Sequence, residues 1–85
     1  MGKYDENDIQ RTEADIFREI LAVASDNADL QAVSPEQYRA KVISDMTALV
    51  SGAKEDDAIR LFFWETGRNP DEMLDAFLER AIATL

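Results

Sequence analysis

Two short segments of the sequence carry the same helix-start signature. Ser-Pro-Glu-Gln at residues 34–37 and Asn-Pro-Asp-Glu at residues 69–72 each place proline directly after a side chain that can cap a helix. Proline suits the first helical position because its missing N–H needs no partner there. Apolar residues at helical spacing follow both segments. The sequence therefore predicts one helix that begins at Pro35 and another that begins at Pro70.

The spacing of apolar residues predicts two further helices. They cover about residues 8–24 and residues 55–66. Gly52 and Gly67 are natural end points for the helices that precede them. Residues 25–30 are predicted to form a loop, because serine, aspartate and asparagine side chains compete for backbone hydrogen bonds.

These elements predict the all-α class, as a small four-helix bundle-like domain. We expect residues 1–85 to form a single acidic helical domain, with residues 1–7 as a flexible N-terminus. One apolar cluster drawn from all four helices should form its core. The side chains expected there are Phe17, Ile20, Val42, Met46, Phe62, Phe77 and Leu78.

The residue types that are missing exclude most catalytic and metal chemistry. The 85 residues contain no histidine and no cysteine. The chain therefore lacks the usual ligands of structural zinc and the imidazole that activates a serine nucleophile. Its clustered carboxylates stand at predicted helix starts, where the helix dipole accounts for them. We expect no enzyme activity, no catalytic residue, no cofactor and no bound metal.

The charge balance also limits the classes of partner. The chain has 18 acidic and 9 basic residues, and its formal net charge is −9. A field of this sign repels nucleic-acid phosphates and anionic membranes. The glycine turn before Pro70 joins two predicted helices as a helix-turn-helix does, but Asp71, Glu72 and Asp75 would repel DNA there. The longest apolar run, residues 20–24, is too short to span a bilayer. We expect a soluble cytoplasmic protein with no direct nucleic-acid binding and no membrane association.

The predicted third helix is apolar on two sides. One face within residues 58–63 points toward the core, whereas Leu61 and Trp64 lie on the opposite side. Asp57 and Arg60 accompany that pair, and Arg60 also has the spacing to pair with Asp56 on the same helix. Such a helix is either central in its bundle, with Trp64 covering a flank of the core, or presents a contact surface. As the candidate protein-interaction site we name Asp57, Arg60, Leu61 and Trp64.

These features favour a non-enzymatic protein–protein interaction module, acting as an adaptor, an inhibitor or a regulatory subunit. Its expected partner is another protein or a second copy of the chain, which would make a homodimer. The alternative is an acidic DNA mimic, as in phage or mobile-element proteins, whose carboxylates block a nucleic-acid-binding protein. The two functions differ in salt response, because binding through charges weakens with ionic strength more than binding through leucine and tryptophan does.

Overall fold

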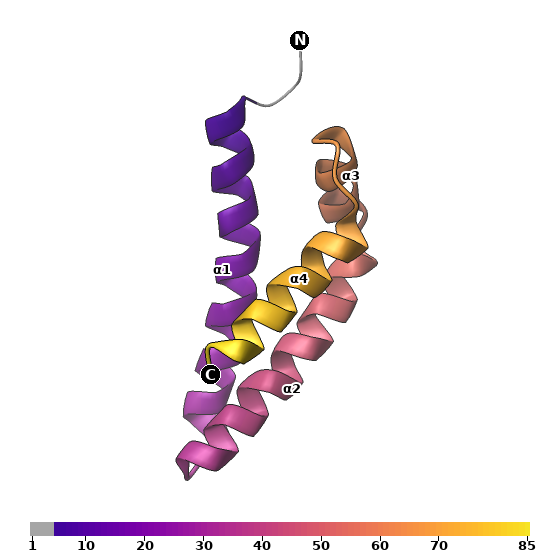
Figure 1. Cartoon of the computed structure of the whole chain (residues 1–85). Coiled ribbons are helices and arrows are strands. Elements are labelled where there is room, and N and C mark those ends of the chain that lie inside the picture. Colours follow the sequence, from indigo (N-terminus) through magenta and orange to yellow (C-terminus); the bar gives the residue numbers. More distant parts are fainter. Residues whose placement is uncertain (1–4) are drawn as a thin grey trace.

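The computed structural model describes residues 5–85, and this part of the chain consists of four helices joined by short turns (Figure 1). The helices are α1 (Glu6–Gln31), α2 (Pro35–Lys54), α3 (Asp57–Glu65) and α4 (Pro70–Ala83). The described residues contain no strand. The predicted all-α class with a small four-helix, bundle-like arrangement is confirmed.

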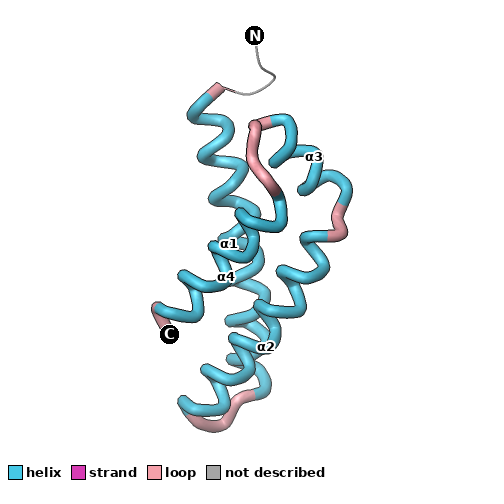
Figure 2. The backbone as a smooth tube through the Cα atoms, turned by 45° about the vertical axis from the view of Figure 1, so that its right-hand side comes forward, coloured by secondary structure: helices cyan, strands magenta, loops and turns pink. Residues whose placement is uncertain are grey.

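The molecule is elongated because its two longest helices form an antiparallel hairpin. Helices α1 and α2 lie side by side toward the turn that joins them, and α4 crosses this hairpin on one face (Figures 1 and 2). The short helix α3 follows α2 at the other end. The overall extents are 51 × 22 × 20 Å. Helix α2 contacts all three other helices and is the centre of the fold.

Both proline-containing helix starts are confirmed at the predicted residues. The backbone N–H of Gln37 donates to Ser34 Oγ at 3.2 Å, and the N–H of Glu72 donates to Asn69 Oδ1 at 3.1 Å. Each cap satisfies one of the N–H groups that the first turn of a helix leaves without a partner. These two side chains therefore position the starts of α2 and α4.

Helix α1 begins at Glu6, two residues earlier than the apolar spacing indicates. Asp5 is its N-cap, and its carboxylate accepts a hydrogen bond from the N–H of Asp8 at 2.8 Å. The expected flexible N-terminus covers residues 1–7, of which residues 1–4 lie outside the described part of the chain. Residues 6 and 7 belong to the helix.

The predicted loop at residues 25–30 is wrong, because α1 continues through this segment to Gln31. Ala24 and Ala28 lie one turn apart and are fully buried within the hydrophobic core. Asp26 and Asp29 are exposed, so their side chains reach water without interrupting the helix. Tertiary packing of the alanine face outweighs the weak local preference of these polar residues for a turn.

Of the two glycines predicted to end helices, Gly67 does so and Gly52 does not. Gly52 does not end α2, which continues to Lys54 and buries Ala53 in the core. Gly67 does follow the end of α3, with a φ of +78°, in the left-handed region that favours glycine. The N–H of Arg68 then bonds to the carbonyl of Phe63 at 2.9 Å, as in a Schellman motif.

The core contains most of the residues predicted for it. Five of the seven expected side chains are buried, whereas Phe17 and Leu78 are only partly buried and pack against the buried cluster. The rings of Phe17 and Phe77 stack with their centroids 4.5 Å apart, which joins α1 to α4. Phe63 has no exposed surface at all and is the largest fully buried side chain.

Candidate functional site

The outer face of α3 carries the two apolar side chains that the sequence singles out. Leu61 is 55% exposed and Trp64 is 54% exposed, while Phe62 and Phe63 on the same helix are buried. Asp57 is also exposed on this side of the helix. We call Asp57, Leu61 and Trp64 the α3 surface. The bundle core holds one of the two apolar sides of α3, and Trp64 on the other side keeps more than half of its surface exposed.

Arg60, the fourth predicted site residue, contacts two neighbouring elements of the fold. Its Nη1 donates to the carbonyl oxygen of Lys54 at 2.8 Å and also lies 3.3 Å from Asp71 Oδ1. The expected pairing with Asp56 is replaced, because the Asp56 carboxylate caps α3 by accepting from the N–H of Ile59 at 3.0 Å. Arg60 thus joins α3 to the end of α2 and the start of α4, and it is not a free charge beside Trp64.

A second candidate surface is a groove that no segment of the sequence reveals by itself. It lies between α1, α2 and the start of α3, is open to solvent and has a volume of about 450 Å³. We call it the α1–α3 groove. Its lining consists of Ile16, Glu19, Ile20, Val23, Ala48, Leu49, Gly52, Ala53, Asp56 and Ile59.

The walls of the α1–α3 groove are mainly apolar, and one position in it is sterically open. A Cβ atom added to Gly52 would meet no heavy atom within 4 Å. Val23 is exposed, and Ile16, Leu49 and Ile59 are partly buried. Only tertiary packing brings these helices together, so the sequence offered one partial signal, the seven-residue spacing of Ile16 and Val23 on one stripe of α1.

The basic side chains are largely occupied by internal ion pairs. Ion pairs form along single helices, among them Asp15–Arg18 at 3.3 Å and Lys41–Asp45 at 3.2 Å. Pairs between elements add to these. They are Lys54–Asp75 at 2.5 Å, Arg60–Asp71 at 3.3 Å and Arg68–Glu13 at 2.5 Å. Many carboxylates therefore remain on the surface without a cation beside them, and the molecule presents a negative field.

The described residues contain neither a metal-binding cluster nor a membrane-spanning helix. Within residues 5–85, no three acidic side chains come together in a way that could hold a metal ion. None of the four described helices combines the length and the apolar character that crossing a bilayer requires.

Comparison of the chain with known proteins identifies no similar protein. No protein family matches the sequence, and neither a curated protein nor a solved structure matches the chain. The α3 surface and the α1–α3 groove therefore carry what can be inferred about function.

Proposed function

We propose that this protein is a non-enzymatic interaction module that binds another protein through the α3 surface. The exposure of Leu61 and Trp64, each more than half accessible on a helix whose other side fills the core, supports this proposal. Covering water-exposed leucine and tryptophan with a partner removes apolar surface from water and so favours binding. Tryptophan is also enriched among the residues that dominate binding energy. Within this function the chain acts as an adaptor, an inhibitor or a regulatory subunit.

The surroundings of the pair match the usual layout of an interface. An apolar centre with a polar rim is typical of protein–protein contacts. Asp57 supplies a carboxylate one turn before Leu61, and the N-terminus of α3 places it at solvent. Because Arg60 is held by Asp71 and the Lys54 carbonyl, the rim on this side is acidic rather than mixed. A partner with basic groups around an apolar pocket fits this arrangement.

The test uses an Asp substitution in the α3 surface and a matched substitution elsewhere. Leu61→Asp places a charge in the centre of the proposed contact, while Val33→Asp makes a similar change at a side chain that is 86% exposed in the turn between α1 and α2. Wild type and both variants are used as bait for affinity purification from the native host. Light scattering over a wide concentration range determines whether a second copy is the partner.

The expected result is that Leu61→Asp loses the partner, whereas Val33→Asp retains it and both variants keep the wild-type helicity and melting temperature. Unfolding of Leu61→Asp would show instead that the side chain supports the core. The salt response separates the alternative function. A DNA mimic would lose its partner as ionic strength rises and would be insensitive to Leu61→Asp, because its contacts are between charges.

A further inference from the structure

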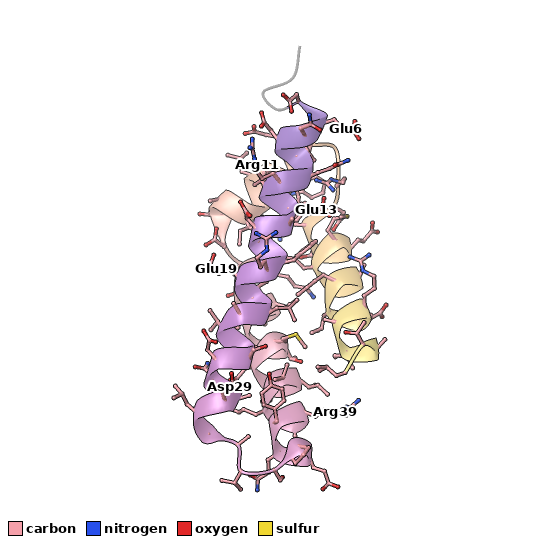
Figure 3. All side chains as sticks on the ribbon, turned by 90° about the vertical axis from the view of Figure 1, so that its left-hand side faces the viewer. Glu6, Arg11, Glu13, Glu19, Asp29 and Arg39 are labelled. Carbon is pink, nitrogen blue, oxygen red and sulfur yellow. The ribbon has the colours of Figure 1, made fainter. Side chains whose placement is uncertain are left out.

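The α1–α3 groove is a second surface, separate from the one that carries the proposed function. On α3, Ile59 lines the groove, whereas Leu61 and Trp64 lie on the outer side of the helix. Glu19 marks the groove on α1, and Figure 3 shows it on the side of α1 opposite to α4. Helix α4 covers one face of the hairpin, and the groove remains open on the other.

A helix is the occupant that the groove's apolar stripe favours. Ile16 and Val23 line the groove on α1 at a seven-residue interval, and Leu30 continues the same stripe of the helix beyond the groove. Val23 and Leu30 are both exposed, Leu30 to 85%. A stripe with this repeat is what a neighbouring helix packs against, with its own apolar residues entering the spaces between turns.

The charges around the groove select the kind of helix. Glu19 and Asp56 lie in its lining, and neither carboxylate forms an ion pair with any residue of the described chain. The cations near these two residues in the sequence pair with other carboxylates: Arg18 with Asp15, Lys54 with Asp75 and Arg60 with Asp71. The groove is thus an apolar channel with an acidic rim.

The same charges disfavour a second copy of the chain as the occupant. Two copies would bring together surfaces that each belong to a molecule with a net charge of −9. Like charges placed across an interface oppose association, whereas a cationic partner gains attraction and a faster encounter.

We propose that the α1–α3 groove binds an amphipathic helix of another protein, one that carries lysine or arginine on both flanks of its apolar face. The apolar side chains of that helix enter between α1 and α2, where Gly52 leaves space. Its flanking cations meet Glu19 on one rim and Asp56 on the other. The site is independent of the α3 surface and does not rest on the function proposed for it.

Two synthetic helical peptides test the proposal on the full chain. Both have the same leucine face, and one has lysine on its flanks while the other has glutamate. We expect the lysine peptide to bind at least about tenfold more tightly at low salt, because the rim is acidic. In amide NMR spectra of the labelled protein, the Gly52 signal should shift on binding, while the Gly67 signal in the α3–α4 turn should not. Equal binding of the two peptides, or shifts at Gly67 without Gly52, would overturn the proposal.

Variants of the groove sharpen the test. Gly52→Trp fills the groove at a position with open space, and Ser51→Trp adds the same side chain at the neighbouring exposed position of α2. We expect Gly52→Trp to lower the affinity for the lysine peptide by about tenfold or more, and Ser51→Trp to leave that affinity nearly unchanged. If Gly52→Trp bound the lysine peptide with wild-type affinity, the peptide would not occupy the α1–α3 groove and the proposal would be refuted. Self-association that Gly52→Trp abolishes would also refute it, by assigning the groove to a second copy.

A charge variant keeps the proposal testable if Gly52→Trp disturbs the fold. Glu19→Gln with Asp56→Asn removes both rim charges, and asparagine retains the ability to cap α3. The control, Asp29→Asn with Glu79→Gln, removes two exposed charges that do not line the groove. We expect the rim variant to bind the lysine peptide about fivefold more weakly with less salt dependence, and the control to resemble wild type. An equal loss of affinity in both variants would show that the attraction depends only on the net charge of the protein, and it would overturn the proposed recognition.

Discussion

Arg68 and Glu13 are separated by 55 positions in the sequence, yet Arg68 Nη1 donates a hydrogen bond to Glu13 Oε2 at 2.5 Å. The same guanidinium lies 5.4 Å from the centroid of the Phe63 ring and 3.3 Å from Thr66 Oγ1. Figure 3 shows Glu13 and Glu19 on different sides of α1, one toward the α3–α4 turn and one on the groove. The pair thus holds α1 against the turn that precedes α4.

We expect Arg68→Ala to destabilise the protein by about 1–3 kcal/mol, because it removes a partly buried ion pair and uncovers an aromatic ring. Glu13→Gln keeps a hydrogen-bond acceptor and should cost less, roughly 0.5–1 kcal/mol. Urea unfolding of the two single variants and the double variant gives the coupling between the side chains. Arg18→Ala breaks the exposed pair with Asp15 and is the control, with an expected change of at most about 0.5 kcal/mol. Equal effects of Arg18→Ala and Arg68→Ala would contradict a special role for the Glu13 contact.

The N-caps of α2 and α4 give a second prediction. Ser34→Ala and Asn69→Ala should each lower the free energy of unfolding by about 1 kcal/mol, because each leaves a first-turn N–H without its side-chain acceptor. Ser34→Asp and Asn69→Asp retain an acceptor and should stay close to wild type. Urea denaturation followed by circular dichroism measures all four. Neutral alanine variants would mean that water replaces both caps without loss.

Gly52→Ala should make the protein more stable. Gly52 lies within α2, has no positive φ, and has room for a methyl group. Alanine restricts the unfolded chain and favours the helix, so we expect a gain of about 0.5–1 kcal/mol. Gly67→Ala should do the opposite, since its φ of +78° is unfavourable for alanine. Thermal melts of the two variants should therefore shift in opposite directions, and a shift of both in one direction would conflict with this backbone geometry.

The aromatic core gives a fourth prediction. Phe63→Ala and Phe77→Ala should each cost about 3–5 kcal/mol, because each leaves a cavity among buried side chains. A loss of this size is comparable to the whole stability of a small domain, so the variants should be partly unfolded at 25 °C. Phe77→Leu, which retains most of the volume, should remain folded. A Phe63→Ala variant that melts within a few degrees of wild type would show that the ring is not part of the core.

Helix starts could be predicted from the sequence because local atoms decide them. Ser34 and Asn69 cap through hydrogen bonds that span three residues, and proline reinforces the position. The end of α1 could not be predicted in this way. Residues 25–30 have the composition of a loop, and they are helical because Ala28 packs into the core, which local sequence does not show.

The candidate surfaces divide along the same line. Helical geometry alone predicts that Leu61 and Trp64 lie on the side of α3 opposite to its core-facing residues, but it left open whether they are exposed, which the packing of the helices decides. Arg60 contacts Asp71, which is eleven residues away on another helix. The spacing rule for ion pairs one turn apart on a single helix could not predict this contact. The α1–α3 groove exists only once three helices pack together, and the seven-residue spacing of Ile16 and Val23 indicates just one of its walls.

The position of α2 between the other helices has a consequence for how the molecule opens. Helices α3 and α4 contact α2 and one another, so residues 35–85 share contacts that do not involve α1. Helix α1 is buried in the core at Ile20, Ala24 and Ala28, and nearer its start Phe17 and Glu13 join it to α4 and to the α3–α4 turn. Within residues 6–12, Ile9 is the one apolar side chain that packs against the core. Hydrogen exchange should therefore be fastest at the amides of residues 6–12 and slowest in the middle of α2. Partial unfolding would begin with the start of α1 lifting away while the remaining three helices stay associated.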